Sequence, residues 1–167
     1  MKVLAFDPGY ERLGVAVLER DKAARNGTKL VMSDCVRTSA KDSFHLRLKQ
    51  LGNAAEQLIA EYAPDAVALE KVYFEKNAKT AMGIAEVRGM LAYIAASHDI
   101  PICEYTPLEV KTAVTGYGRS DKAAIALMLP RLIDLPATKK RLDDEMDAIA
   151  VALTCLATVK QKRKASP

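Results

Sequence analysis

The sequence contains no tryptophan, and aromatic residues of all kinds make up only 5% of its 167 residues. No apolar run approaches the ~20 residues that a membrane-spanning helix requires. The N-terminus also lacks the order of charged, apolar and small residues that is typical of a secretory signal. These absences argue against a membrane protein and lead us to expect a cytosolic one.

Cysteine and histidine are also scarce. The three cysteines, Cys35, Cys103 and Cys155, are far apart and not in CxxC spacing, so neither a disulfide framework nor a zinc site is indicated. Each lies in an apolar segment, and we expect all three in the core. His45 and His98 fall on or at the ends of predicted helices, where we expect exposed or hydrogen-bonded side chains rather than catalytic bases.

The remaining composition is that of a globular protein, with 50% hydrophobic and 28% charged residues. We expect one domain over residues 1–159, followed by a basic tail at 160–167. The formal net charge of +4 permits an anionic partner such as nucleic acid but does not demand one.

The N-terminal segment places a carboxylate at the end of a predicted strand. The uninterrupted apolar run 3–6 is typical of a strand that is covered on both faces. Pro8 and Gly9 end it, and 14–18 reads as a second strand that returns beside the first. Asp7 therefore either caps the turn through the backbone or needs a cation or a hydrogen-bond donor to offset its burial.

Further predicted strands cover residues 30–38, 66–69 and 102–105, and predicted helices cover about 44–63, 77–97, 107–114, 121–132 and 143–159. Asp42 or Ser43 and, further along, Ser120 are candidate helix caps, and Pro130 predicts a kink or an early end. This order predicts an α/β fold in which an antiparallel hairpin and its neighbour join two parallel strands through crossovers. We expect a five-stranded mixed sheet with helices on both faces and a site near the ends of its central strands.

Acidic residues also open the last predicted helix. Asp147 lies three residues after Asp144 and four after Asp143, so either pair shares a helix face and the spacing leaves the choice open. Asp147 leads directly into an apolar stretch, where an unpaired anion is costly. For Asp143 and Glu145 we expect only the favourable interaction of an acid with the helix dipole.

Glu70 closes the predicted strand 66–69 as Asp7 closes the first. With one or two of the helix aspartates, these acids form a set of oxygen ligands that suits Mg²⁺ or Mn²⁺ rather than zinc. Two such ions can activate water on one side of a phosphodiester and stabilise the leaving oxygen on the other. The alternative is a protein without metal in which some of these acids stay protonated.

Taken together, these segments resemble the RuvC-type Holliday junction resolvases over nearly the whole chain. The matching stretches are FDPG at 6–9, LEKVYFEKN at 69–77, EVRG at 86–89, EVKTAVTGYG at 109–118 and DEMDAIA at 144–150. The resemblance implies an RNase H-like fold and a homodimer that makes paired, symmetric, Mg²⁺-dependent nicks in a four-way DNA junction, in recombination and repair. It implies two ions per site, with Mn²⁺ able to substitute, and branch-migration proteins as candidate partners.

The resemblance also assigns roles to residues. It implies that the catalytic, metal-binding acids are Asp7, Glu70, Asp144 and Asp147, which selects Asp144 over Asp143 by likeness alone.

The same likeness implies that Tyr73 packs against bases at the opened crossover and that Lys111 and Lys122 lie near the scissile phosphate. Lys76 and Arg119 are candidates for phosphate contacts to the junction arms. The predicted helix with Gly83 and Gly89 corresponds to the dimer helix of the family, although its small residues also suit close packing within one chain.

Some features depart from the family or fit other classes. Residues 10–13 replace the usual hairpin pattern, and Glu11 and Glu75 add negative charge where DNA is expected. The hairpin also resembles YqgF-type nucleases proposed to act on RNA, which explains Tyr73 and 111–118 less well. Actin-like ATPases share such a hairpin, but a second phosphate-binding hairpin is missing here. A junction-binding module that does not cut is the remaining alternative.

Overall fold

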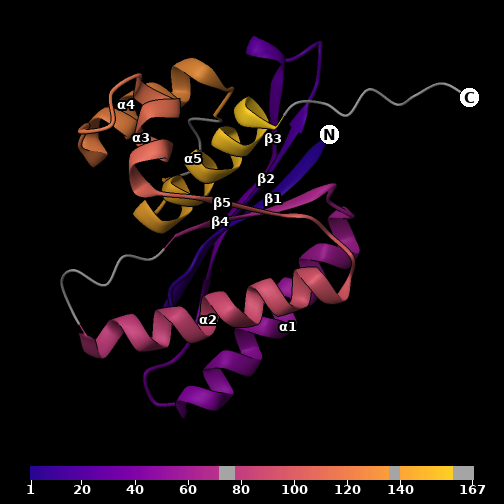
Figure 1. Ribbon diagram of the computed structural model, residues 1–167, viewed down its shortest axis with the longest axis vertical. Coiled ribbons are helices and arrows are strands. Elements are labelled where there is room, and N and C mark those ends of the chain that lie inside the picture. Colours follow the sequence, from indigo (N-terminus) through magenta and orange to yellow (C-terminus); the bar gives the residue numbers. More distant parts are fainter. Residues whose placement is uncertain (72–77, 136–139, 160–167) are drawn as a thin grey trace, which may run out of the picture.

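The computed structural model describes residues 1–71, 78–135 and 140–159, which form a central sheet with helices on both faces (Figure 1). The strands are β1 Lys2–Asp7, β2 Arg12–Arg20, β3 Thr28–Arg37, β4 Ala66–Glu70 and β5 Ile102–Tyr105. They form a five-stranded sheet in the order β3-β2-β1-β4-β5. β1, β2 and β3 pair antiparallel, whereas β4 and β5 run parallel to β1, so the expected mixed sheet is confirmed.

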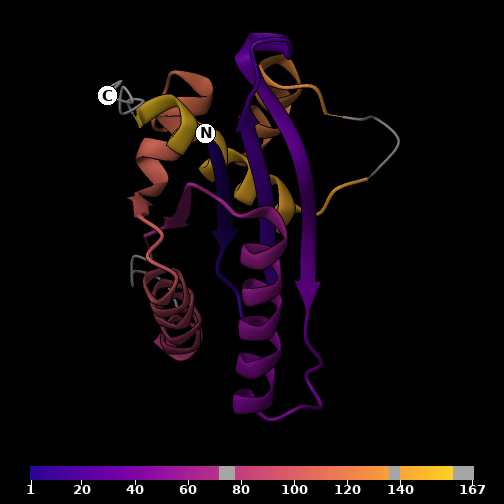
Figure 2. The same cartoon turned by 90° about the vertical axis from the view of Figure 1, so that its right-hand side faces the viewer.

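The helices are α1 Phe44–Tyr62, α2 Ala78–Ser97, α3 Pro107–Thr115, α4 Lys122–Leu132 and α5 Asp143–Thr158, and a short 3-10 turn, η1 Arg25–Gly27, precedes β3. α1 and α2 lie on one face of the sheet, and α3, α4 and α5 lie on the other (Figure 1). Figure 2 shows α1 and α2 next to each other on their shared face. No helix in the described part of the chain is long and apolar enough to cross a bilayer.

Side-chain size differs between the two faces of the sheet. The face toward α5 carries small residues, among them Ala5, Ala16 and Ala68, whereas the face toward α1 and α2 carries larger ones such as Phe6 and Leu69. Because alternate residues of a strand point to opposite faces, each strand contributes to both cores. The small residues let α5 pack close to the strands.

The starts of α1 and α4 agree only in part with the sequence-based expectations. Ser43 caps α1 as expected, but Asp121, not Ser120, caps α4, because the Ser120 hydroxyl lies 2.7 Å from Thr115 Oγ1 while the Asp121 carboxylate accepts a hydrogen bond from Ala124 N. Pro130 lies inside α4, which continues to Leu132.

The expectation that all three cysteines belong to the core is confirmed for Cys155, which is buried on α5. Cys103 is partly exposed but packs against the core on the α5 side, whereas Cys35 is partly exposed and belongs to neither core cluster, so the expectation is wrong for Cys35. Their strands, β3 and β5, form the two edges of the sheet, where coverage by helices is incomplete. His45 is exposed, and His98 is exposed with its Nε2 2.5 Å from Glu56 Oε2, as expected for histidines outside a catalytic site.

Candidate active site

The parallel strands β1 and β4 bring Asp7 and Glu70 to the same edge of the sheet. Phe6 pairs with Leu69, so the acids that follow them end adjacent strands, which lie about 4.8 Å apart in any sheet. Asp7 alternates with Ala5 and Glu70 with Ala68, two alanines of the α5 side. Both carboxylates therefore project toward α5.

Gly14 on β2 allows the first turn of α5 to approach these acids. A Cβ atom at position 14 would overlap the backbone carbonyl oxygen of Asp144 and lie 3.2 Å from the Cβ of Asp7. Only a residue without a side chain leaves room for this contact. Asp144 is partly buried there, whereas Asp143 is exposed.

The four acids lie within one another's electrostatic field. Burial, together with the charges of Asp147, Glu70 and Asp144, raises the pKa of Asp7 to about 8, while Lys122 acts in the opposite direction. Burial and the charge of Asp147 likewise raise the pKa of Glu70. At neutral pH the metal-free protein therefore keeps a proton on Asp7.

Two cations balance the acids of α5. Lys122 Nζ donates to Asp147 Oδ2 at 2.7 Å, and this hydrogen bond raises the pKa of the lysine. Arg12 Nε lies 3.2 Å from Asp144 Oδ2. That contact lacks hydrogen-bond geometry, so among the described residues Asp144 Oδ2 is buried without a hydrogen-bond partner.

A cleft of about 360 Å³ opens beside these groups. Its lining includes Asp7, Glu70 and Asp147 together with Lys111 and Lys122, and its apolar walls come from Pro107, Val110, Ile125 and Val151. A larger cavity of about 570 Å³ lies elsewhere, around residues such as Arg20 and Leu156, and holds none of the predicted site residues. The cleft thus combines acids with two lysines, a combination that suits a phosphate held near cations.

The acids fit a divalent cation in their chemistry but not yet in their arrangement. Within 1–71, 78–135 and 140–159, no three Asp, Glu, His or Cys side chains are placed so that they could hold a metal ion as they stand. Asp147 is instead paired with Lys122, and Asp144 lies beside Arg12. The hard oxygen donors and the unsatisfied Asp144 Oδ2 nevertheless suit Mg²⁺ or Mn²⁺.

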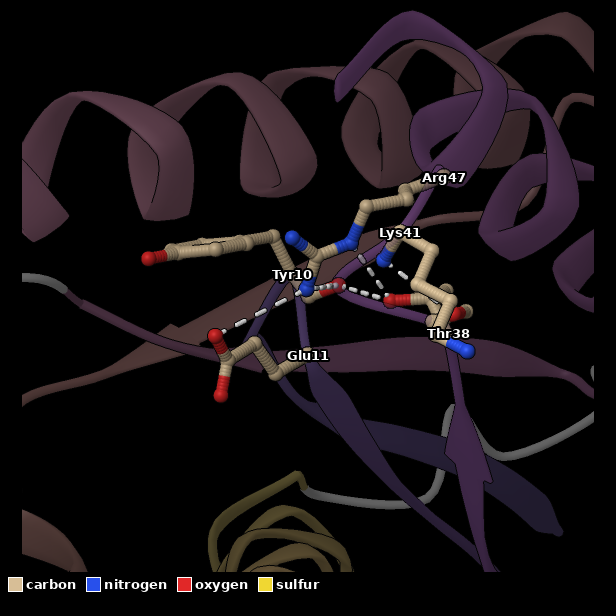
Figure 3. Close-up of polar contacts among 6 residues, drawn as sticks. Tyr10, Glu11, Thr38, Lys41 and Arg47 are labelled. Carbon is tan, nitrogen blue, oxygen red and sulfur yellow. Dashed lines mark hydrogen bonds and ion pairs between the residues drawn. The ribbon is translucent and has the colours of Figure 1, made fainter. Parts of the chain in front are cut away.

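A buried arginine holds the turn that follows Asp7. Arg47 Nε donates to Thr38 Oγ1 at 2.8 Å, Arg47 Nη2 donates to the carbonyl oxygen of Tyr10 at 3.2 Å, and the guanidinium lies 4.7 Å from the centre of the Tyr10 ring (Figure 3). Nη2 also lies 3.9 Å from the exposed carboxylate of Glu11. Arg47 therefore links α1 to the turn between Asp7 and Arg12.

The other predicted DNA contacts have different outcomes. Lys111 lines the cleft, and Arg119 is exposed between α3 and α4. Tyr73, Lys76 and Glu75 lie outside the described residues.

Sequence reasoning missed two residues next to the acids. Arg12 carries no recognisable signal, because it is an exposed residue at the start of a strand. Glu145, expected only to favour the helix dipole, is instead buried, with 2% of its surface exposed. Its spacing from Ala148 and Ile149 places it on the buried face of α5 and was the available signal.

Comparison with known proteins agrees with this arrangement. Residues 3–155 match the family described as Crossover junction endodeoxyribonuclease RuvC. A relative of that name from Desulforamulus reducens is 40% identical over 153 residues, covering 92% of this chain and 91% of the relative.

Solved structures extend the likeness to the fold. A Thermus thermophilus RuvC structure has a TM-score of 0.82 at 28% identity, with 93% of both chains covered. The structure described as T. thermophilus RuvC in complex with Holliday junction substrate has a TM-score of 0.84 with the same identity and coverage. The RNase H-like fold is thereby confirmed, and the chain belongs to the RuvC family of crossover junction endodeoxyribonucleases.

Proposed function

We propose that this protein resolves four-way DNA junctions by paired, symmetric nicks in opposed strands, in recombination and DNA repair. The observation that supports this most directly is the group of acids at the ends of β1 and β4 and the start of α5, beside a cleft with two lysines. Membership of the crossover junction endodeoxyribonuclease family supplies the reaction. It also favours this function over an RNA nuclease of the YqgF type and over a module that only binds.

We assign Asp7, Glu70, Asp144 and Asp147 as the residues that would hold two Mg²⁺ ions, with Mn²⁺ able to replace them. When bound, such ions supply an activated water and stabilise the charge on the leaving oxygen. Asp7 is the pivotal ligand, because it must give up its proton before its carboxylate can bind a cation.

The cations around the cleft have a different task. Lys122 and Arg12 neutralise Asp147 and Asp144 in the metal-free protein. A divalent ion would take over that role and free Lys122 to contact the DNA phosphate together with Lys111. Arg119 and Lys76 would hold the junction arms by phosphate contacts, and Tyr73 would stack on a base, an interaction that contributes about 1–3 kcal/mol.

A homodimer suits this reaction, since two opposed strands need two sites related by a two-fold axis. One face of α2 carries exposed Met82 and Tyr93 on either side of Gly89, at which a Cβ atom would meet no described neighbour. At Gly83, in contrast, a Cβ atom would lie 3.1 Å from the ring of Tyr10 and 3.3 Å from that of Phe44 within the same chain. We therefore place the dimer contact on the face with Met82, Gly89 and Tyr93.

The direct test is cleavage of a labelled synthetic four-way junction in Mg²⁺, read on a denaturing gel. We expect symmetric nicks from the wild type and none from Asp7→Asn, which should still bind the junction in a gel-shift assay. Linear duplex DNA and RNA of the same sequence serve as matched substrates. Equal cutting of either one would replace this proposal with a non-selective or RNA-directed nuclease, and binding without nicks would leave a junction-binding module.

A nuclease that acts on such junctions works where the DNA is, which we expect to be the cytoplasm. Branch-migration proteins are the further partners that this function predicts, and a pull-down with junction DNA present would test that association.

A further inference from the structure

Helix α5 begins without a side-chain N-cap hydrogen bond. Its N-cap residue is Leu142, which makes no side-chain cap hydrogen bond, and three acids, Asp143, Asp144 and Glu145, occupy the first turn. Helix ends without a cap fray readily. Two proposed metal ligands nevertheless lie on this turn and the next, so some other contact must hold their direction.

Glu145 supplies that contact. Ser33 Oγ on β3 donates to Glu145 Oε1 at 2.6 Å, and Arg141 Nε lies 3.4 Å from the same oxygen. Arg141 Nε also donates to Ser33 Oγ at 3.3 Å. The side chains of Glu145 and Arg141 expose only 2% and 9% of their surface. We call these three residues the Glu145 anchor, which joins β3, the segment before α5 and the first turn of α5.

The anchor ties one side of the first turn of α5 to β3. Successive side chains on a helix are about 100° apart, so residues three positions apart lie within about 60° of each other. With Glu145 directed toward β3, Asp144 and Asp147 face the same side of α5. The carbonyl of Asp144 rests against Gly14 beside Asp7, so a small rotation of α5 would move both aspartates relative to Asp7.

We propose that Glu145 is a positioning residue that keeps Asp144 and Asp147 on the side of α5 nearest Asp7, from which they would bind divalent metal. This inference rests on the proposed function for the identity of the metal ligands. Burying a charged pair is costly, and an apolar residue would fill the same space without that cost. The anchor therefore contributes more to direction than to folding energy. Residues that orient metal ligands typically change metal affinity 10–100-fold when they are replaced.

The test uses the full chain with Mn²⁺ as the probe and no DNA. We expect Glu145→Ala to lose most of the Mn²⁺-induced rise in melting temperature and to need about tenfold more Mg²⁺ for half-maximal junction cleavage. Glu145→Gln, whose amide oxygen can still accept from Ser33, should lose less. Junction binding in EDTA should be unchanged in both variants.

Thr154→Ala is the matched control, because Thr154 is another fully buried polar residue of α5 but bonds to Ala150 of its own helix. It should lower the melting temperature without altering the Mn²⁺ response or the Mg²⁺ requirement. An unchanged Mn²⁺ response in the Glu145 variants, or an equal loss in the control, would overturn the inference. If Glu145→Ala does not fold, the comparison of Glu145→Gln with the control decides in the same way.

The two proposals fail separately. A wild type that binds Mn²⁺ but leaves junctions uncut would overturn the proposed function and leave the anchor to be judged from the Mn²⁺ response. If the wild type cuts junctions and the variants Glu145→Ala and Glu145→Gln respond to Mn²⁺ and Mg²⁺ as the wild type does, only the inference about the Glu145 anchor is overturned.

Discussion

Asp7→Asn should remove most of the decline in stability that the metal-free protein undergoes between pH 6 and pH 8.5. The folded state raises the pKa of Asp7 from 3.8 to about 8, so the folded protein binds a proton that the unfolded chain has lost. For such a group, stability is complete below the unfolded pKa and is lost as pH rises toward the folded value. At about 1.4 kcal/mol per pH unit, the ionisation of Asp7 alone should lower the free energy of unfolding by about 2.5 kcal/mol between pH 6 and pH 8.5.

The assay is urea unfolding in EDTA at pH 6, 7, 8 and 8.5 for the wild type and for Asp7→Asn. Asparagine has nearly the same shape but cannot ionise, so the wild type should lose stability with rising pH while the variant changes much less. Glu70, whose pKa is also raised, should contribute in the same direction, and Glu70→Gln is the matched comparison.

The result that would refute this reasoning is an equal pH slope in the wild type and in Asp7→Asn, since it would mean that Asp7 titrates normally. Calorimetric titration with Mn²⁺ gives an independent check. In buffers of different ionisation enthalpy, binding at pH 7 should release close to one proton from the wild type.

Four further changes test the site, the turn beside it and the dimer. Gly14→Ala should lower the free energy of unfolding by about 1–3 kcal/mol or more and abolish cleavage, because the new methyl group would overlap the Asp144 carbonyl oxygen. Chemical denaturation and a junction-cleavage assay would measure the two effects. Arg47→Met should lower the free energy of unfolding by about 1–3 kcal/mol, because it removes the contacts to Tyr10 and Thr38. Lys49→Met, at an exposed position of the same helix, is the control and should leave the free energy of unfolding unchanged in the same denaturation assay. Tyr93→Glu should yield a folded monomer in sedimentation, and a dimer would move the interface elsewhere. Tyr73→Ala should weaken cutting with dimerisation unchanged, which single-turnover cleavage and sedimentation would measure.

The layout of the fold was accessible from the sequence because two short apolar runs each end in an acid. Val3 to Phe6 and Ala66 to Leu69 have no polar alternation, which identified covered strands, and the intervening helix required a crossover that makes them parallel. Parallel neighbours end at the same edge, so the proximity of Asp7 and Glu70 followed from pattern and topology together.

The start of α5 was less predictable. Spacing alone left Asp143 and Asp144 equivalent. The difference between them arises from a tertiary contact, in which the backbone carbonyl of Asp144 packs against Gly14. Glu145 was misread because an acid near a helix N-terminus has a sufficient local explanation in the dipole. Its partner Ser33 lies far away in the sequence, and Arg141 lies in the irregular segment before α5. No local sequence pattern predicts such a pairing.

The roles of Arg12 and Arg47 were equally invisible. Nothing in the sequence around either arginine indicates its partner. Only the folded structure shows that Arg12 lies beside Asp144 and that Arg47 is buried against Tyr10. The roles assigned to Tyr73 and Lys76 stay predictions, since both lie outside the described residues.

The pairing of Lys122 and Arg12 with the acids has a consequence for the order of events at the cleft. Bare carboxylates would repel a DNA backbone, whereas here the protein supplies its own counterions and Asp7 holds a proton. Docking of the nucleic acid and acquisition of the ions are then separate steps, either of which can come first. Incision is the only stage that would demand both, so a protein–DNA complex formed in the presence of a chelator should begin to cut as soon as free divalent metal is restored.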